Sequence, residues 1–180
     1  MELRMKNQDP STKKVSFAGG ISLIELLTSL TVIALLSSLA TPGINQLLQR
    51  RSQQLALETL FHLSVYSRNE AIKSNDYFTL CPTMDRQRCN GQWNNTLMVF
   101  RDSNKNETID SGENLAKLLS LPPSTPCIDW RSAAKNYLQF KPSGASNGSA
   151  GHFRFCDQLA KRLGKKVVIS LNGRTSIKNL

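Results

Sequence analysis

Residues 19–42, "GGISLIELLTSLTVIALLSSLATP", form a long apolar stretch that is interrupted by a single charge. As a helix, the segment from Ile21 to Thr41 would extend about 31 Å at about 1.5 Å per residue, which matches the hydrocarbon thickness of a bilayer. A carboxylate inside hydrocarbon costs about 2.5–3.5 kcal/mol on insertion scales, so such residues are usually kept for a task. The one acid in this stretch, Glu25, therefore needs an explanation from the rest of the chain.

The rest of the chain has the composition of a soluble protein. Its 180 residues allow one ordinary domain with an appendage, so we expect an apolar stalk that carries a polar head. The formal net charge is +10, to which the first twenty residues contribute little, with four basic residues against two acidic ones. Such an excess favours acidic partners such as nucleic acid or anionic lipid, but it equally describes an ordinary solvated surface.

All four cysteines follow the apolar segment: Cys81, Cys89, Cys127 and Cys156. None forms a CxxC pair and no histidine lies at a ligand spacing, which argues against zinc and favours disulfides in an oxidising compartment. Of the three pairings that four cysteines permit, we predict Cys81 with Cys89, closing a short turn, and Cys127 with Cys156, joining distant strands. The alternative is four buried free thiols in a cytosolic protein.

The apolar segment differs from a secretory signal, because its small residues Ala18, Gly19 and Gly20 precede the apolar core instead of following it. Lys13 and Lys14 flank its amino end. Because positive charge stays on the cytoplasmic side, they predict a cytoplasmic leader and place the chain after the apolar segment outside.

A basic stretch, Gly20, Glu25 five residues later, an apolar run and Pro42 together resemble the amino-terminal signature of type IV pilins and type II secretion pseudopilins. The resemblance implies cleavage after Gly20 by a prepilin peptidase and methylation of the new amino group on Ile21. Ile21 stands where many members have Phe or Met, and the leader is long, as in pseudopilin and minor-pilin variants.

The resemblance also implies a role for Glu25. Cleavage creates a free amine on Ile21 only one helical turn away, and a buried carboxylate is tolerable when it meets a positive partner. As the resemblance implies, Glu25 of one subunit would pair with the Ile21 amine of its neighbour in a helical stack and fix the axial register. The alternative is an incidental polar residue that faces another helix.

After the stalk, the sequence predicts one more helical stretch and then short strands. Pro42 and Gly43 cost about 3 and about 1 kcal/mol inside a helix, so we expect a kink or a locally melted stretch there. Helical periodicity resumes to Ile72, and Asn75 with Asp76 should end it. Short strands rich in β-forming residues are predicted at 77–81, 96–101, 137–141, 152–156 and 166–171.

The sequence also predicts the conformation of the segments between these strands. Residues 115–121 are ambiguous between strand and helix, 121–130 read as a rigid extended connection, and 141–151 as a flexible loop. Asn172-Gly173 predicts a two-residue hairpin turn. The predicted fold class is α+β and type IV pilin-like, with a long N-terminal α-helix packed on a C-terminal antiparallel β head.

The head sequence resembles the GspH/FimT/FimU-type heads of minor pilins and pseudopilins, on "SRNEAIKSNDYFTLCP", "FKPSGASNGSAGHFRFC" and "VVISLNGR" among others. The implied organisation is a leader at 1–20, a transmembrane assembly helix at 21–48 and a periplasmic head at 49–180. The implied location is the bacterial inner membrane, with a single pass, and after assembly the filament. The implied partners are other pilins or pseudopilins, the prepilin peptidase and the inner-membrane assembly platform.

The segment "DSNKNETIDSGE" resembles a calcium-binding EF-hand loop in its spacing of oxygen-bearing side chains. It lacks the glycine that the loop needs at its sixth place, where Glu107 stands, and no helix flanks it. A polar hairpin turn is the alternative. The candidate calcium ligands are Asp102, Asn104, Asn106, Thr108, Asp110 and Glu113.

The carboxyl-terminal segment is the candidate nucleic-acid site, because no acidic residue follows Asp157. Some FimT-type members that bind DNA in natural transformation end in Gly-Arg-x-Arg-x-Arg, of which Gly173 and Arg174 are kept here, with lysine in the last place. A solvated basic ribbon is the alternative. The candidate cations are Lys161, Arg162, Lys165, Lys166, Arg174 and Lys178.

No catalytic motif or cofactor site is predicted. His62 and His152 lie far apart in the sequence, and no nucleophile elbow, HExxH or phosphate loop occurs. Two functions remain: a minor pilin or pseudopilin placed near the tip or in priming of a filament, and a minor pilin that serves as a DNA receptor. An enzyme is not expected.

Overall fold

The computed structural model describes residues 20–132, 135–156 and 164–180, and for residues 38–43 and 46 it describes the backbone only. The predicted leader, apart from Gly20, lies outside these ranges. The chain divides into two compact units, Met1–Gly43 and Ile44–Leu180, which we call the stalk unit and the head unit. The predicted boundary between stalk and head was after Leu48.

A single helix, α1, runs from Leu23 to Ser74. Its backbone is helical through Pro42 and Gly43, so the predicted locally melted stretch is wrong, whereas a kink there stays a prediction. Proline removes one backbone hydrogen bond, but its fixed φ is compatible with a helix, and neighbouring turns hold the helical path. The helix ends as predicted: Asn75 has φ of 53°, Asp76 N donates to Ala71 O over 3.2 Å, and the chain turns away.

The head part of α1 buries one face in the core of the head unit. The buried positions recur at intervals of three and four, which is the helical period. Two of them are serines, whose hydroxyls donate back to Leu60 O and Leu63 O over 2.7 and 2.8 Å, so no polar group is stranded. The buried residues of this face are Gln53, Ala56, Leu57, Leu60, Leu63, Ser64, Ser67 and Ala71.

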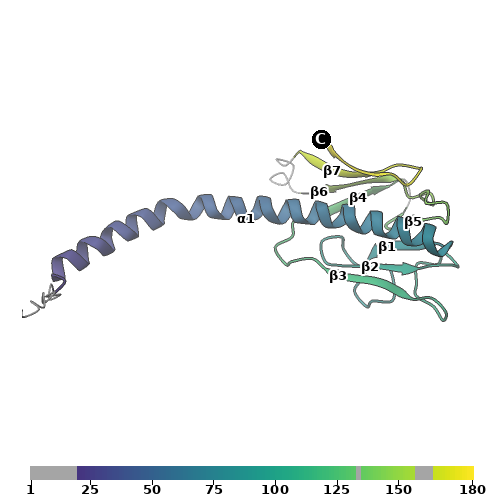
Figure 1. The fold of residues 1–180 in the computed structure, drawn as a ribbon, viewed down its shortest axis with the longest axis horizontal. Helices are drawn as coiled ribbons and strands as arrows, with labels where there is room; N and C mark the ends of the chain where they lie inside the picture. The colour runs from purple at the N-terminus through teal and green to yellow at the C-terminus, as the bar shows by residue number, and fades with distance from the viewer. Residues whose placement is uncertain (1–19, 133–134, 157–163) are drawn as a thin grey trace, which may run out of the picture. The chain divides into compact units, whose positions relative to one another are not determined.

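Two antiparallel sheets of four strands complete the head. In Figure 1, strands of the first sheet lie below α1 in that view and strands of the second above it. The first has the order β3-β2-β1-β5, formed by Leu115–Ser120, Thr96–Arg101, Phe78–Pro82 and Leu138–Phe140. The second has the order β4-β6-β7-β8, formed by Ile128–Ser132, Gly151–Phe155, Lys165–Ile169 and Thr175–Asn179.

The structure has the predicted α+β class. Residues 115–120, which are ambiguous in the sequence, form a strand, and β4 begins within the last three residues of the stretch predicted as an extended connection. β4 is hard to recognise in the sequence, because three prolines, at 122, 123 and 126, lie just before it and indicate a segment without a strand. None of the three lies within β4. Ile128 and Trp130 alternate inward along β4, which gives it a place in the core.

An aromatic cluster joins the second sheet to the loop that precedes β2. The rings of Trp93 and Trp130 lie 4.6 and 4.4 Å from the ring of Phe153, measured between centroids. The main core also contains the buried face of α1 and the inner faces of both sheets. The helix and the two sheets therefore contribute side chains to one shared hydrophobic core.

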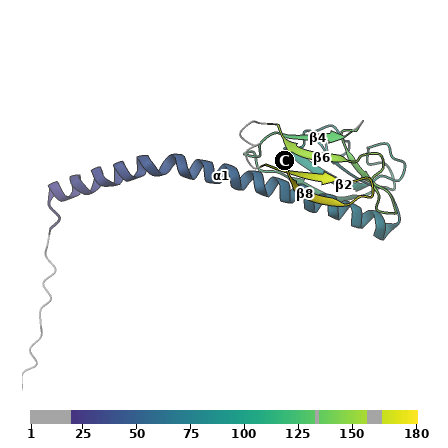
Figure 2. The same cartoon turned by 90° about the horizontal axis from the view of Figure 1, so that it is seen from above.

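The 141–150 segment and the β7–β8 hairpin meet at the end of the head where α1 stops. Arg68 Nε donates to Gly144 O over 2.9 Å, and Ser146 N donates to Leu171 O over 3.1 Å. A Cβ on Gly173 would overlap Gly144 O, so the two backbones touch here. The segment predicted as a flexible loop is thus a hydrogen-bonded connector between α1 and the second sheet. Figure 2 shows β8 next to α1 and β4 farther from it in that view.

The hairpin between β7 and β8 exists, but its turn is not the predicted two-residue type. Gly173 N donates to Ser170 O over 2.9 Å and Ser170 N donates to Arg174 O over 3.1 Å. Only Gly173, with φ of 76°, has a positive φ here, whereas a type I′ turn would need one at Asn172 too. The loop is therefore a tight turn followed by a bulge with glycine in the left-handed conformation.

Candidate assembly and binding surfaces

Glu25 lies in the first turn of α1, next to the predicted cleavage site. Gly20 and Ile21 precede the helix, and the backbone N–H groups of Glu25 and Leu26 donate to Ser22 O over 3.0 and 3.1 Å. A carboxylate at this end of a helix is favoured by the positive end of the helix dipole. The structure thus places Glu25 one turn from the residue that would become the new amino terminus.

The stalk part of α1 presents apolar side chains to its surroundings on all sides. Three of its hydroxyls are satisfied locally, since Thr28, Ser29 and Thr31 each donate to a backbone carbonyl three residues earlier. Among the described residues, no helix is both long and apolar enough to qualify as a membrane span. The exposed large apolar residues of the stalk unit are Ile21, Leu23, Ile24, Leu26, Leu27, Leu30, Val32, Ile33, Leu35 and Leu36.

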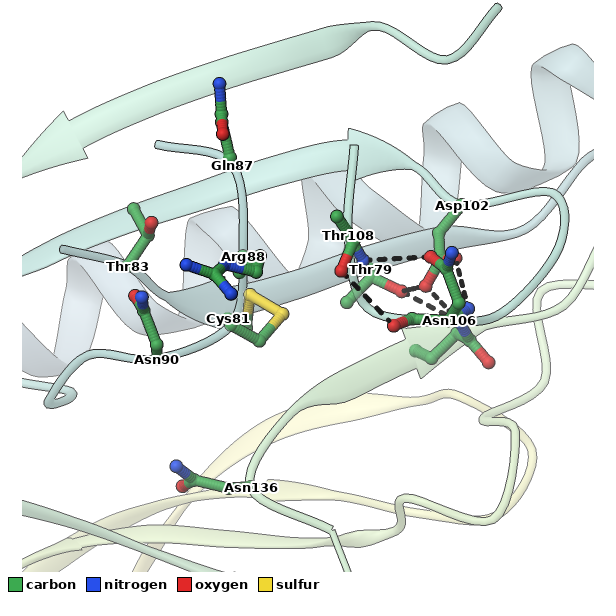
Figure 3. The surroundings of a disulfide bond; sticks show 12 residues. Thr79, Cys81, Thr83, Gln87, Arg88, Asn90, Asp102, Asn106, Thr108 and Asn136 are labelled. Carbon is green, nitrogen blue, oxygen red and sulfur yellow. Dashed lines mark hydrogen bonds between the residues drawn. A yellow bond between two sulfur atoms is a disulfide. The ribbon is translucent and has the colours of Figure 1, made fainter. Parts of the chain in front are cut away.

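A second, smaller core covers the outer face of the first sheet. Cys81, Met98, Phe100 and Tyr137 are buried in it, and the Cys81–Cys89 disulfide lies at its edge. Figure 3 shows this disulfide with the 83–90 segment on one side and the 102–108 segment on the other. The two segments pair, since Cys89 N donates to Glu107 O over 3.2 Å and Ile109 N to Gln87 O over 2.9 Å.

The second disulfide joins Cys127 to Cys156, so the structure forms the predicted pairing of all four cysteines. Cys127 precedes β4 and Cys156 follows β6, and Cys156 N donates to Cys127 O over 3.0 Å. This bond therefore ties together one end of two neighbouring strands. Two bonds of this kind fit an oxidising compartment.

Removal of the Cys127–Cys156 bond is expected to destabilise the head more than removal of the Cys81–Cys89 bond. The sequence separations are 29 and 8 residues. The chain-entropy relation then gives about 3.5 against about 2.5 kcal/mol in the free energy of unfolding. Denaturant unfolding of the two Cys→Ala double variants measures both losses. Equal losses, or a larger one for the short loop, would contradict loop closure as the main term.

The predicted calcium ligands do not converge on one point. Asp102 is fully buried, and its Oδ2 accepts from Thr79 Oγ1 and Gln139 Nε2 over 2.6 and 2.8 Å. The side-chain amides of Asn104 and Asn106 donate to Asp110 Oδ2, and these two bonds hold the pKa of Asp110 below its usual range. Among the described residues, no three acidic, imidazole or thiol groups are arranged to hold a metal ion.

Glu113 closes the same segment as a backbone cap. Its Oε1 accepts from Ser103 N over 2.8 Å and its Oε2 from Asp110 N over 3.2 Å. Glu107, at the place where an EF-hand loop needs glycine, has φ of 66°. Thr108, the remaining candidate, donates its backbone N–H to Asn106 Oδ1. The loop is therefore organised as a polar hairpin; calcium binding stays a prediction.

The outer face of the second sheet gathers positive charge from four strands. Paired residues of antiparallel strands point to the same face, and the register pairs Arg131 with His152, Asp129 with Arg154, and Lys166 with Lys178. His152 also pairs with Val168. The inward residues Trp130, Phe153 and Val167 are buried on the opposite face. We call this surface the basic face; it consists of Asp129, Arg131, His152, Arg154, Lys166, Val168, Ser176 and Lys178.

Comparison with known proteins decides the family. Residues 56–173 match the family described as "Type II transport protein GspH". The chain belongs to the GspH family. Two crystal structures of the type IV minor pilin FimU from Pseudomonas aeruginosa PAO1 share its fold, each with 21% identity. The TM-scores are 0.54 and 0.51, over 72% and 69% of this chain and 90% and 91% of the FimU chains.

No curated protein sequence gives a significant match. The family and the fold identify a minor pilin or pseudopilin of the GspH/FimU type, as predicted. Proteins of this type are structural subunits and not enzymes.

Of the six cations predicted for nucleic acid in this GspH-family chain, the four that the structure describes do not form one patch. Lys161 and Arg162 lie outside the described residues. Lys166 and Lys178 lie opposite each other on the basic face, whereas Lys165 pairs with Asn179 on the other side of the ribbon. Arg174 lies at the far end, in the hairpin turn. Arg131 and Arg154, which complete the basic face, come from β4 and β6 and were not predicted.

His152 is expected to titrate below its usual pKa. Partial burial is the main cause, and the charges of Lys166, Arg154 and Arg131 outweigh that of Asp129. The pKa of His152 in the folded protein lies below its value of about 6.5 in the unfolded chain. Its contribution to the free energy of unfolding is therefore fully present above about pH 6.5 and is lost as the pH falls through the pKa of the folded protein. A proton NMR titration measures this pKa, which should rise in Lys166→Gln. A value at or above 6.5 would contradict the arrangement of the basic face.

Proposed function

We propose that this GspH-family subunit enters a type IV pilus or type II secretion filament through the stalk part of α1, with Glu25 as the residue that sets its position. The observation that carries this proposal is the lone carboxylate in the first helical turn, followed by apolar side chains exposed around the helix. Exposure of this surface to water would cost about 25 cal/mol for each Å² of apolar accessible area. The surface is therefore suited to a bundle of similar helices or to lipid.

The proposed partner of Glu25 is the amine that cleavage after Gly20 would create on Ile21 of a neighbouring subunit. Within one chain, Ile21 and Glu25 are four residues apart, so subunits staggered along a common axis bring the two groups together without a long reach. Once desolvated, the pair is strongly coupled, because loss of one partner leaves a buried charge at a cost of about 3–5 kcal/mol. The stagger is thus fixed by electrostatics and the lateral contact by packing.

The proposed location is the bacterial inner membrane, with one pass and a periplasmic head, followed by the assembled filament. The apolar surface of the stalk and the two disulfides of the head support this location. The proposed partners are major and minor pilins or pseudopilins, the prepilin peptidase and the inner-membrane assembly platform. A place near the tip or in priming of assembly belongs to the same proposal.

Mass spectrometry of the protein extracted from membranes tests the processing step. The expected polypeptide begins at Ile21, carries one added methyl group and lacks four thiol protons, because both disulfides are formed. A control sample with Gly20→Ala should keep residues 1–20. A wild-type chain that still begins at Met1 would overturn the proposal.

A DNA receptor in natural transformation is the second proposed function, and it has narrower support. Of the predicted cations, Lys166 and Lys178 are neighbours across β7 and β8, and Arg174 lies in the exposed turn. Transformation frequency of the Arg174→Ala strain, with filaments counted in parallel, tests this role. An unchanged frequency with normal filaments would remove it.

A further inference from the structure

A groove lies between the first turns of α1 in the head unit and the turn at residues 122–124. Its volume is about 540 Å³, and its lining is mostly apolar, with Leu48 and Leu55 on the helix side and Pro122 on the other. The two leucines are 61% and 48% exposed, so the groove is open to its surroundings. None of these apolar side chains has the cover that the core of the head gives to its own residues.

The two walls of the groove are connected. Ser52 Oγ on α1 donates to Ser124 O over 3.3 Å, which joins the helix to the turn. The turn itself is closed by Thr125 N, which donates to Pro122 O over 2.9 Å. A site that is already formed loses little conformational entropy when a ligand binds. The groove therefore has the construction of a binding site.

The groove also carries a positive charge. Arg51 lines it, and among the lining residues, all of which the structure describes, none is acidic. In the described part of the chain Arg51 has no ion pair. A guanidinium group binds phosphate through two parallel hydrogen bonds. Asn45 and Gln49 add side-chain amides to the same lining. An apolar floor with a phosphate-binding group matches a ligand that has an apolar part and an anionic part.

The volume of the groove distinguishes between classes of ligand. An α-helix is about 10–12 Å in diameter and rises about 5.4 Å per turn, so a single turn occupies about 500 Å³. A helix that docks in a groove uses anchors over about two turns, which this groove is too small to hold. Sites for small molecules have volumes of about 300–1,000 Å³. The volume thus favours one small amphiphilic molecule over a partner helix.

The chain keeps the groove close to the membrane that would hold the stalk. The predicted apolar segment ends at Thr41, four residues before Asn45. Four residues extend at most about 14 Å. The polar layer on each side of a bilayer is about 5–8 Å thick. The Asn45 end of the groove is therefore within reach of lipid headgroups if the stalk spans the bilayer.

We propose that this groove binds one anionic phospholipid, with an acyl chain on Leu48, Leu55 and Pro122 and the phosphate on Arg51. The inference rests on the proposed membrane location and gives the head a ligand of its own. A lipid bound in this way holds the base of the head at the membrane surface.

Native mass spectrometry of the full chain, purified from membranes in non-ionic detergent, tests the proposal with added phosphatidylglycerol or phosphatidylcholine. We expect one phosphatidylglycerol to be retained per chain, at a lower lipid concentration than phosphatidylcholine requires. Arg51→Gln should weaken retention about 10-fold, because a charge-assisted hydrogen bond is lost. Leu48→Ser should weaken it about 10-fold as well, because the acyl chain loses apolar contact.

The chain offers a matched control for each variant. Arg50→Gln removes the same charge from the neighbouring residue, which does not line the groove. Leu47→Ser removes a leucine that is 67% exposed, against 61% for Leu48, and that also lies outside the lining. Both controls should retain lipid as the wild type does. Thermal unfolding of all four variants verifies that each is folded.

Four results would overturn the proposal. The first is that no lipid is retained. The second is an equal loss in the variants and their controls, which would assign retention to general attraction. The third is displacement of the lipid by excess inorganic phosphate, which would indicate a site for a free anion. The fourth is lower filament incorporation of Leu48→Ser with unchanged lipid retention, which would assign the groove to a neighbouring subunit.

The same spectra separate this inference from the proposed function. They give the mass of the polypeptide, so they show whether the chain begins at Ile21 or still at Met1. A processed chain that retains no lipid would overturn the lipid site alone. A chain that begins at Met1 would overturn the proposed processing, whatever lipid it retains.

Discussion

Replacement of Gly173 by Ala is expected to lower the free energy of unfolding of the head by about 4 kcal/mol, because two costs add at this position. The new Cβ would overlap Gly144 O, a backbone atom that cannot rotate away. In addition, φ of 76° is unfavourable for any residue with a Cβ. To relieve the clash, the hairpin must move off the connector that Arg68 holds through the same carbonyl. Thermal unfolding should show a fall in Tm of about 8–16 °C.

Gly148→Ala is the matched control for this prediction. Gly148 has φ of 68°, close to that of Gly173, but nothing lies within 4 Å of an added Cβ. The free energy of unfolding of Gly148→Ala should therefore fall by only about 1 kcal/mol, which is the effect of backbone conformation alone. If the two variants melt at the same temperature, the contact between Gly173 and Gly144 does not stabilise the head as described.

Asp102→Ala is the second substitution with a large expected effect, again about 4 kcal/mol in the free energy of unfolding. The Asp102 carboxylate is fully buried and accepts from Thr79, from Gln139 and from Asn106 N. Hydrogen bonds to a charged group contribute about 1.5–3 kcal/mol each, and removal of the acceptor leaves buried donors unsatisfied. Urea unfolding at neutral pH measures the loss.

Two further substitutions separate this network from a calcium site. Asp110→Ala, in the same loop, removes an exposed acceptor and should shift the urea midpoint much less than Asp102→Ala. Asp102→Asn keeps the shape but presents an amide to three donors, so it should fall between Asp102→Ala and the wild type. If calcium raises the stability of the wild type but not that of Asp110→Ala, the loop is a metal site and not a polar hairpin.

The sequence predicts well what depends on local pattern. The apolar run with Glu25, the helix end at Asn75, most of the strands and the disulfide pairing follow from spacing and residue type. Two local predictions are wrong: the melted stretch at Pro42 and the two-residue turn at Asn172-Gly173. A proline removes one backbone hydrogen bond, and the loss of one bond does not require a long helix to end there.

Features that depend on pairing between distant strands could not be predicted. The basic face requires that Arg154 and Asp129 be neighbours across β4 and β6 and that Lys166 and Lys178 be neighbours across β7 and β8. A shift of one residue in either register would send these side chains into the core. The turn at Gly173 is another case, because the contact with Gly144 comes from a segment almost thirty residues earlier.

If a carboxylate in the first turn of an apolar helix positions this subunit in its filament, neutralising that carboxylate should prevent incorporation. The test compares incorporation of Glu25→Gln and of Glu58→Gln into filaments sheared from cells, with total protein measured in the same cells. Both substitutions remove one carboxylate from α1, but only Glu25 lies in the stalk unit. We expect incorporation to fall about 100-fold for Glu25→Gln and to be unchanged for Glu58→Gln. Incorporation of Glu25→Gln at the wild-type level would show that Glu25 does not position the subunit.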